Sequence, residues 1–404
     1  MTATPPPDGF PPLVRATAAL LRAGGGILRD LWLMSGATLI LFLGLEGLYR
    51  AQAAIRASEP ESVRTVVDSA LHPYAHEAWW GPFQGRDGLK VRYNRFDPYR
   101  AFWGTPASSR YVNVDSAGRR VTPQELPPDR GAVRQVFMLG GSTMWGYTSR
   151  DSFAIPALVA RELHDRGVMD VEVVNLAQGA YNSTQEAATL LLELAHGRIP
   201  AAVVALNGYN DIATAYKYGG TGHIYGEAGI AQQIDLGRRE FWGELIGLGR
   251  HSALVVRLRR KFGLDKPAAE PRPAPDALCA DVARYYHGIA RVTDAMGREW
   301  GFSVVHILQP FQSASHKVPT AWERTLHGPV VHAQCATAIE AEMARDPRAI
   351  SFVSLTGMFD IDSATVFVDE NAHVTEVANR RIAARIADEL APLLRGAASP
   401  STQR

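Results

Sequence analysis

The carboxyl-terminal two-thirds of the chain alternates short, continuous apolar runs with longer stretches of helical periodicity. The apolar runs cover residues 134–139, 171–176, 201–206, 302–308 and 350–355. The helical stretches cover residues 153–167, 183–195, 280–300, 331–345 and 374–394. Strands that are apolar on both faces and separated by helices are typical of a parallel sheet covered on both sides. The pattern therefore predicts an α/β fold, a three-layer αβα sandwich with about five parallel strands.

A longer apolar run lies near the amino terminus. Residues 31–49 contain one charged side chain, Glu46, and have Trp32 and Tyr49 near their ends, where interfacial aromatic residues usually lie. The length is close to the ~20 residues that a helix needs to cross a bilayer. We predict a single transmembrane helix here, with a buried core helix as the alternative. A cleaved signal peptide is disfavoured, because residues 1–30 precede the run and only Ala51-Gln52-Ala53 resembles a cleavage site.

The charges on the two sides of this predicted span do not fix its orientation. The basic residues balance, with Arg15, Arg22 and Arg29 before the run and Arg50, Arg56 and Arg64 after it. Acidic residues make the distal side less positive, but they contribute little to orientation. We expect the amino terminus in the cytoplasm and the large domain on the extracytoplasmic side of the membrane, periplasmic or extracellular.

The remaining segments predict the domain organisation. Residues 1–30 form an amino-terminal tail, and residues 50–132 form a stalk and an irregular, aromatic-rich pre-domain. The α/β domain extends over residues 133–395, and a disordered tail follows at 396–404. Within the domain, residues 212–278 interrupt the alternation, and a long insertion of this kind is typical of a lid or binding element.

Composition excludes several classes of protein. A formal net charge of +1 gives no basic face for nucleic acid. The 12 histidines are scattered without a metal-binding motif, so we predict neither a metal site nor a cofactor. The chain has 2 cysteines, Cys279 and Cys335, which we interpret as buried small hydrophobic residues. A disulfide in an oxidising compartment is the alternative, because sequence does not give the distance between them.

Candidate chemistry lies in the loops that follow the predicted strands, since ligands of parallel sheets bind at the carboxyl ends of the strands. After the first strand, Gly140-Gly141-Ser142 places a serine at the start of a helix, where the dipole favours negative charge. A phosphate-binding turn or a simple helix cap would have the same pattern. The second strand leads to Gly179 and the third to Asn210, and either is also compatible with an ordinary turn.

The last loop, before the final helix, contains Asp369, Glu370 and His373. A histidine close to carboxylates is a candidate general base with its orienting acid, although a solvated charged loop is the competing interpretation. Together the four loops supply a nucleophile, two hydrogen-bond donors and an acid–base pair at one edge of a sheet. Acyl transfer requires these groups, because a serine needs a base and its oxyanion needs preset donors.

This set of motifs resembles the SGNH/GDSL hydrolase superfamily over residues 133–394. Gly140-Gly141-Ser142 is similar to the first block, Gly179 falls at the glycine of the second, and 208–211 fits the G-x-N-D of the third. His373 matches the histidine of the last block. The resemblance implies the flavodoxin-like SGNH hydrolase fold. It also implies an oxyanion hole made by the backbone N–H groups of Ser142 and Gly179 and the amide of Asn210.

The sequence departs from the family pattern in two places. Gly141 stands where the name motif has aspartate, which other relatives also tolerate. The family's last block is D-x-x-H, but here Glu370 lies three residues before His373 and Asp369 lies four before it. We favour Asp369 as the orienting acid, because aspartate is the usual type and a one-residue bulge would accommodate it. Glu370, or a serine–histidine dyad, remains an alternative.

Residues 115–120, Asp-Ser-Ala-Gly-Arg-Arg, resemble the N-S-x-G-x-R stretch that precedes the catalytic domain in membrane-anchored bacterial members. The resemblance implies a serine esterase that acts on O-acyl, chiefly O-acetyl, esters of cell-envelope or exported polysaccharide. An O-acyltransferase with the same triad, or an inactive envelope scaffold or binding module, is the alternative. Aromatic residues of the insertion that could stack on sugar rings, although such residues more often serve the packing of the lid itself, are Tyr216, Tyr218, Tyr225, Phe241 and Trp242.

Overall fold

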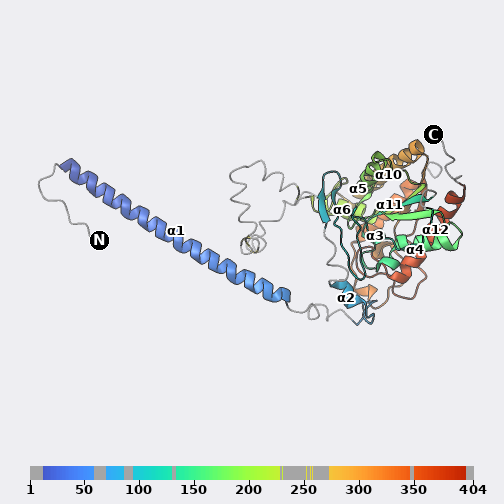
Figure 1. The fold of residues 1–404 in the computed structure, drawn as a ribbon, viewed down its shortest axis with the longest axis horizontal. Helices are drawn as coiled ribbons and strands as arrows, with labels where there is room; N and C mark the ends of the chain where they lie inside the picture. The colour runs from blue at the N-terminus through green and yellow to red at the C-terminus, as the bar shows by residue number, and fades with distance from the viewer. Residues whose placement is uncertain are drawn as a thin grey trace. The chain divides into compact units, whose positions relative to one another are not determined.

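The structure is a computed structural model, shown in Figure 1. It describes residues 12–58, 70–85, 94–129, 133–227, 273–345 and 350–396, together with residues 230, 252, 255 and 257. The chain divides into two compact units. One unit consists of Met1–Val67 and Ala228–Ala269, and the other consists of Asp68–Glu227 and Glu270–Arg404. The second unit contains all of the predicted site residues.

The first unit is built on helix α1, Pro12–Ser58. Its segment Arg29–Ala51 is long and apolar enough to cross a membrane, and only 6% of that stretch is buried. A core helix would bury its apolar side chains, so the exposure of α1 disfavours that alternative. The helix is longer than the predicted span of 31–49: it begins within the predicted tail and ends within the predicted stalk.

Glu46 is the one carboxylate within residues 31–49, and both of its oxygens accept hydrogen bonds. Arg50 Nε donates to one carboxylate oxygen at 2.7 Å, and Ser252 Oγ donates to the other at 2.8 Å. Arg257 donates to the hydroxyl of Tyr49 at 3.1 Å. Paired charges at the end of an apolar helix suit the polar boundary of a bilayer, where a carboxylate is far less costly than at its centre.

The second unit contains the predicted parallel sheet. Its strands are β3 (Arg134–Gly140), β4 (Val171–Asn175), β5 (Ala202–Asn207), β6 (Ser303–Leu308) and β7 (Ser351–Ser354). They are all parallel in the order β4-β3-β5-β6-β7, which is the flavodoxin-like order. The predicted fold class is confirmed, because each continuous apolar run forms a strand within one or two residues of its predicted limits.

Helices cover both faces of this sheet (Figure 1). One face packs against α4 (Ile155–Asp165) and α12 (Glu376–Gly396) through side chains such as Val136 and Met138. The other face turns the alternate residues Phe137 and Leu139 towards α5 (Ser183–Ala195). The same face also carries α10 (Pro275–Trp300), which packs against α5, α6 (Tyr209–Tyr218) and α11 (Val330–Met343).

Two helices extend into the predicted insertion of residues 212–278. Helix α6 extends to Tyr218, and α10 begins at Pro275, five residues earlier than predicted. The predicted insertion of 212–278 is therefore shorter at both ends. The reason is that α6 and the start of α10 bury Ile212, Ala215 and Leu278 in a shared core, which outweighs the local turn signals.

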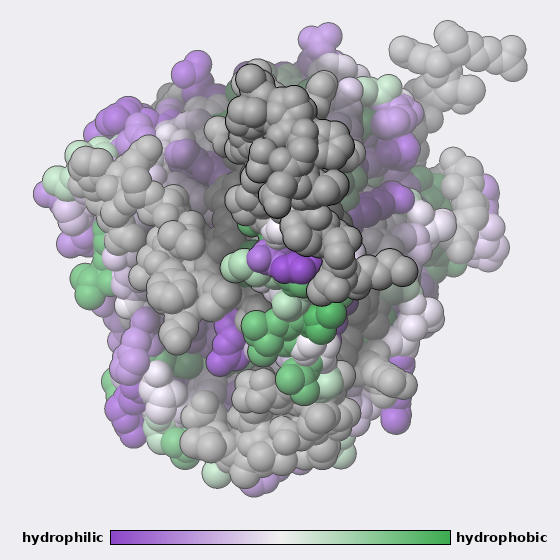
Figure 2. Space-filling view, turned by 90° about the vertical axis from the view of Figure 1, so that its left-hand side faces the viewer, coloured by the Kyte–Doolittle hydropathy of each residue, from purple (hydrophilic) through white to green (hydrophobic). Residues whose placement is uncertain are grey.

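The pre-domain belongs to the same unit and is short-stranded, as its sequence predicts. It contains α2 (Trp80–Gln84) and an antiparallel hairpin of β1 (Asn94–Asp97) and β2 (Ala101–Gly104). Its buried aromatic residues Phe83 and Trp103 join the cores on the two faces of the sheet. In the view of Figure 2, hydrophobic (green) residues gather near the middle and hydrophilic (purple) residues lie mostly towards the edges.

The two cysteines form a disulfide, which corrects the interpretation favoured from sequence. Cys279 on α10 and Cys335 on α11 are joined with an S–S distance of 2.02 Å, and both are buried. Their Cα atoms lie 4.3 Å apart because α10 and α11 pack side by side. The sequence separation of 56 residues gave no sign of this closeness.

Removing the cross-link is expected to destabilise this unit. The double variant Cys279→Ala/Cys335→Ala frees a long loop in the unfolded chain, so the free energy of unfolding should fall by about 2–4 kcal/mol. Denaturant unfolding of the full chain in detergent, followed by tryptophan fluorescence, measures this. A reductant should destabilise the wild type by a similar amount and leave the variant unchanged. Equal unfolding midpoints for oxidised wild type and variant would contradict the expectation.

Candidate active site

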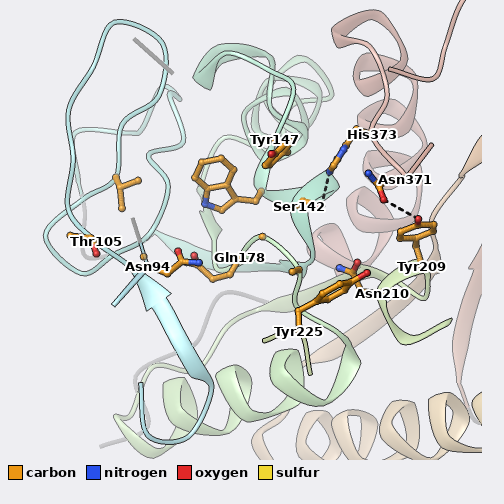
Figure 3. A pocket seen from close by; sticks show the side chains of 15 residues that line it. Asn94, Thr105, Ser142, Tyr147, Gln178, Tyr209, Asn210, Tyr225, Asn371 and His373 are labelled. Atoms are coloured by element: carbon orange, nitrogen blue, oxygen red, sulfur yellow. Dashed lines mark hydrogen bonds between the residues drawn. The ribbon is translucent and has the colours of Figure 1, made fainter. Parts of the chain in front are cut away.

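A cavity of about 500 Å³ opens at the carboxyl edge of the sheet (Figure 3). The loops after β3, β4 and β5 contribute Ser142, Gly179 and Asn210, and the loop before α12 contributes His373. The predicted residues from four separate segments thus line one cavity. The other described lining residues are Asn94, Gly104, Thr105, Val114, Trp145, Tyr147, Gln178, Ala180, Tyr209, Tyr225 and Asn371.

Ser142 is the first residue of the short helix α3 (Ser142–Trp145), directly after β3. The two glycines before it are required by close contacts. A Cβ at Gly140 would lie 2.7 Å from the carbonyl oxygen of Leu206, and a Cβ at Gly141 would lie 2.3 Å from Nδ2 of Asn210. Glycine at 141, where the family motif has aspartate, therefore lets the Asn210 amide approach the serine turn.

His373 lies directly over this serine. Its Nε2 is 2.7 Å from Ser142 Oγ, and only 6% of the residue is exposed. At this distance the imidazole is in position to accept the hydroxyl proton. The two residues are 231 positions apart in the chain, so only the packing of α12 and α4 against the sheet brings them together.

The carboxylate that contacts the imidazole is Asp369. Its Oδ2 lies 2.5 Å from Nδ1 of His373, on the side of the ring opposite Ser142. A bridge between Phe367 and Val374, with Val368 N–H donating to His373 O, closes the loop and folds Asp369 back onto the ring. Among the described residues, no side-chain hydrogen bond or ion pair connects Glu370 to His373.

The local environment keeps Asp369 ionised at neutral pH. Burial alone would raise the pKa of this carboxyl, but the charge and hydrogen bond of His373, with help from Asn371, outweigh burial and lower the pKa below its usual range. The group therefore loses its charge only when the pH falls below the normal range of an aspartate. An ionised carboxylate at Nδ1 fixes the imidazole tautomer that leaves Nε2 free to accept a proton.

Three contacts that the sequence did not reveal hold His373 in place. Tyr147 stacks on the imidazole with ring centroids 4.5 Å apart and an angle of 14° between the planes. The hydroxyls of Thr143 and Thr148 donate to the carbonyls of Ala372 and Val374, at 2.8 and 3.0 Å. All three residues lie within six positions of Ser142, so one segment supports both the serine and the histidine.

The predicted oxyanion donors lie around the serine. Asn210 uses one Nδ2 hydrogen to bind the carbonyl of Tyr181 at 2.7 Å, which leaves its second amide hydrogen for the cavity. Gly179 lines the cavity beside Ala180, whose φ of +67° is unusual for a residue with a side chain. Such backbone conformations gather at functional sites.

Asp211 anchors the Asn210 loop from behind. Its carboxylate accepts hydrogens from the N–H and the hydroxyl of Ser183, at 3.1 and 2.5 Å, at the start of α5. Burial raises the pKa of Asp211 to about 6, while the hydrogen bonds from Ser183 limit the rise. Because this pKa is still below 7, the group is ionised at neutral pH and can accept both hydrogens. The third predicted motif is thus tied to the helix that follows the second.

The structure divides the candidate sugar-stacking aromatic residues between the cavity and packing against other side chains. Tyr225 lines the cavity. Tyr216 instead packs edge-on against His332, and Tyr218 stacks on His223. Phe241 and Trp242 lie outside the described residues. Sequence reasoning missed Asn94, Thr105 and Val114 of the pre-domain as lining residues, because nothing in their local pattern links them to a cleft whose catalytic serine, Ser142, comes much later in the chain.

Serine, imidazole and carboxylate in one hydrogen-bonded line, at the carboxyl edge of a five-stranded parallel sheet, form the arrangement of a serine-hydrolase catalytic triad. Within the described residues, no group of three or more histidine, cysteine, aspartate or glutamate side chains is placed to hold a metal ion.

Comparison with known proteins finds only distant likenesses, all among solved structures. No family model and no curated protein matches the chain. Among solved structures, it is similar to the acetyl xylan esterase AlAXEase (11% identity, TM-score 0.37, covering 63% of this chain and 99% of that one). It is also similar to the lipase/acylhydrolase from Enterococcus faecalis (14%, 0.37, 64% and 96%) and to a member of the lipolytic G-D-S-L family from Veillonella parvula (12%, 0.35, 63% and 97%). These likenesses are too distant to carry an argument about substrate.

The contact of Asp369, and not Glu370, with His373 predicts how the serine will react. Asp369→Asn should slow covalent labelling of Ser142 by a fluorophosphonate by about 10²–10⁴-fold, because the imidazole loses its orienting charge. Glu370→Gln, the matched control in the same loop, should label at the wild-type rate. Labelling rates of the purified full chain in detergent measure both. A slower Glu370→Gln with an unaffected Asp369→Asn would reverse the assignment.

Proposed function

We propose that the protein is a serine esterase of the SGNH/GDSL type, with Ser142 as nucleophile and His373 as general base. The observation that carries the proposal is the continuous line from Ser142 Oγ through His373 to Asp369, with distances of 2.7 and 2.5 Å. The unusual spacing of the acid was the sequence feature that favoured an inactive scaffold. The contact between Asp369 and His373 removes that ground.

In the first half of the reaction, Ser142 Oγ attacks the carbonyl carbon of an ester while its proton passes to Nε2 of His373. Asp369 stabilises the imidazolium that forms. The negative charge on the carbonyl oxygen is met by the N–H groups of Ser142 and Gly179 and by the second amide hydrogen of Asn210. Donors that the fold fixes before the reaction need not reorganise as the charge develops.

The first half ends when the imidazolium gives its proton to the departing alcohol and the acyl group stays on Ser142. In the second half His373, again neutral, takes a proton from a water molecule that attacks the acyl-enzyme. This attack forms a second tetrahedral intermediate. It collapses when the bond to Ser142 Oγ breaks and the imidazolium returns its proton to Oγ, which releases a free carboxylic acid and restores the serine. If a sugar hydroxyl replaced the water, the same groups would transfer the acyl chain, so analysis of products with and without an acceptor separates hydrolase from acyltransferase.

As substrate we propose O-acyl, chiefly O-acetyl, esters of cell-envelope or exported polysaccharide. The cavity combines the aromatic side chains Trp145, Tyr209 and Tyr225 with the amides of Asn94 and Asn371. Aromatic faces pack against the apolar faces of sugar rings, and amides both donate to and accept from hydroxyl groups. A cavity of about 500 Å³ is also larger than an acetyl group alone requires.

We further propose that α1 anchors the protein as a single-pass membrane protein, with the hydrolase unit on the extracytoplasmic side. The buried Cys279–Cys335 disulfide supports this side of the membrane, because disulfides persist in oxidising compartments and are rare in the cytosol. A polysaccharide substrate would be met in the same compartment.

Loss of the nucleophile is the first test of the activity. Ser142→Ala should lower kcat on an aryl acetate by several orders of magnitude while the protein still folds, because no other group can form the acyl-enzyme. Release of acetate from an O-acetylated polysaccharide, measured in parallel, tests the substrate class. Asn210→Ala should cost about 10²–10³ in kcat. Wild-type turnover by Ser142→Ala would refute the proposed activity.

Protease protection tests the sidedness. In spheroplasts of a producing bacterium, protease added outside should degrade the hydrolase unit and leave a fragment containing α1, since the proposed domain lies beyond the membrane. A cytoplasmic marker protein controls for lysis. If the hydrolase unit survives until the cells are broken open, the proposed orientation is wrong.

A further inference from the structure

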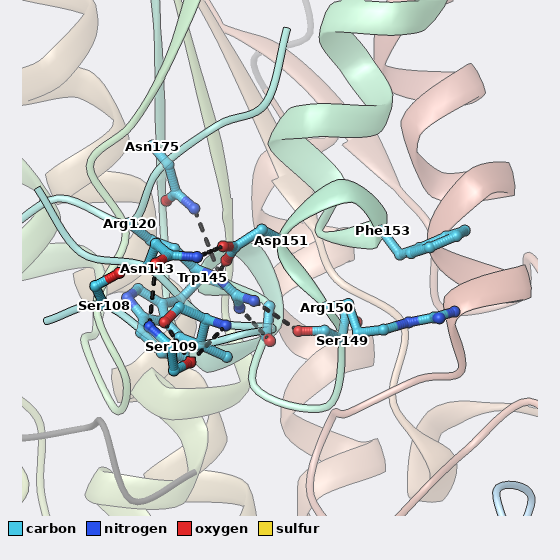
Figure 4. Close-up of polar contacts among 12 residues, drawn as sticks. Ser108, Ser109, Asn113, Arg120, Trp145, Ser149, Arg150, Asp151, Phe153 and Asn175 are labelled. Carbon is cyan, nitrogen blue, oxygen red and sulfur yellow. Dashed lines mark hydrogen bonds and ion pairs between the residues drawn. The ribbon is translucent and has the colours of Figure 1, made fainter. Parts of the chain in front are cut away.

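The turn at residues 115–120 belongs to the pre-domain and takes no part in the proposed reaction, yet its last residue reaches the active site. The guanidinium of Arg120 is buried, with 1% of the residue exposed. Figure 4 shows the polar contacts that surround it. Burying an arginine is costly unless its donors are satisfied, so the position of each donor is informative.

The donors of Arg120 bind the segment that follows the nucleophile. Nη1 donates to the carbonyls of Trp145, at 2.9 Å, and Gly146, and Nη2 donates to that of Ser149 at 2.6 Å. Nε donates to Asp151 Oδ1 at 2.9 Å. Trp145 and Gly146 are the last residue and the C-cap of α3, where helical carbonyls lack intrahelical partners. Arg120 supplies hydrogen bonds at the end of the helix that carries Ser142.

Gly146 is shaped for this contact. Its φ is +95°, and a Cβ there would lie 2.5 Å from Nη1 of Arg120 and 2.7 Å from Cβ of Ala154. Asp151, in turn, receives a second hydrogen bond from Asn113 Nδ2 at 2.8 Å. Two residues of the pre-domain, Arg120 and Asn113, therefore contact the segment that follows the nucleophile.

The segment that Arg120 holds is the one that supports His373. Tyr147, which stacks on the imidazole, and Thr148, which binds the carbonyl of Val374, lie between the carbonyls that Arg120 binds. A shift of this segment would therefore move the histidine relative to the serine. Reactive geometry is sensitive to such movements, and displacements near 1 Å can cost about 10²-fold in rate.

The same turn also contacts the loop of the second predicted oxyanion donor. The carbonyl of Gly118 accepts a hydrogen bond from Gln178 Nε2 at 3.1 Å, and Gln178 directly precedes Gly179. Gln178 N–H also donates to the carbonyl of Gly140 in the nucleophile loop. Asp115 closes the turn by accepting from Arg119 N–H at 2.9 Å.

We propose that residues 115–120 act as a brace that sets the geometry of the active site, with Arg120 as a positioning residue for the Ser142–His373 pair and Gln178 as its contact to the Gly179 loop. This inference rests on the proposed esterase function. It assigns the pre-domain a part in catalysis, although none of its brace residues touches the reacting atoms.

The test compares full-length Arg120→Lys and Arg120→Ala with wild type in detergent, on an aryl acetate. Because the brace acts on the geometry of the reacting groups, kcat should fall by about 10²-fold in Arg120→Ala while KM is unchanged. Added guanidinium ion should restore part of the lost kcat in Arg120→Ala by occupying the vacated site. Lysine, which lacks the planar fork, should not substitute for arginine.

Arg134 provides a matched control. It too binds a carboxylate and a backbone carbonyl, those of Asp170 and Leu394, but it starts β3 at the edge of the sheet opposite the site. Arg134→Lys should lower Tm without lowering kcat per fluorophosphonate-titrated site. If Arg120 variants also lose only Tm, with normal kcat per titrated site and no guanidinium rescue, Arg120 is merely structural and the inference is overturned.

Gln178→Met keeps the inference testable if Arg120 variants fail to fold. This change removes the donor to Gly118 but preserves the shape of the side chain, so kcat should fall while Tm changes little. Wild-type kcat in Gln178→Met would count against the brace. Failure of the esterase proposal itself is distinguishable, because it would appear as undiminished turnover in Ser142→Ala.

Discussion

The arrangement of this active site depends on one imidazole held between two oxygens. Serine is a weak nucleophile until a base accepts its proton, and the base works only in the tautomer that Asp369 imposes. The 2.5 Å contact with Asp369 lies within one loop, but the 2.7 Å contact with Ser142 joins segments 231 residues apart. Any element that shifts one segment against the other therefore bears on the chemistry, and most of the hydrolase unit can be understood as fixing this distance.

The parallel sheet provides the coarse placement and the loops provide the fine placement. Because β3, β4 and β5 are adjacent and parallel, their carboxyl ends bring Ser142, Gly179 and Asn210 to one edge without any long-range side-chain contact. His373 comes from outside the sheet, and its position relies on Tyr147, Thr143 and Thr148. The buried guanidinium of Arg120 then ties this supporting segment to the pre-domain. This gives an irregular segment that precedes the α/β domain a structural connection to the active site.

The membrane helix and the disulfide concern a different question, which is where the chemistry takes place. An exposed apolar stretch over Arg29–Ala51 requires a nonpolar environment that the described residues of the chain do not supply. The cross-link between α10 and α11 lies on the side of the sheet away from α4 and α12 and is distant in sequence from every proposed catalytic residue. Both features support the proposal that α1 is a membrane anchor and that the hydrolase unit lies outside the cytoplasm.

The sequence by itself determined the strands, most of the helices and the order of the motifs, because hydrophobic periodicity and chain order are local properties that one chain displays directly. It also indicated Ser142, Gly179 and Asn210, since parallel topology alone gathers the ends of neighbouring strands. His373 was indicated by the last motif, in the loop before the final helix. Only the tertiary structure decided between Asp369 and Glu370, joined Cys279 to Cys335, and brought Arg120 to the nucleophile loop. Each of these depends on a distance of a few ångströms between segments remote in the chain, and such distances are set by the packing of helices and the closure of loops, which no local pattern encodes.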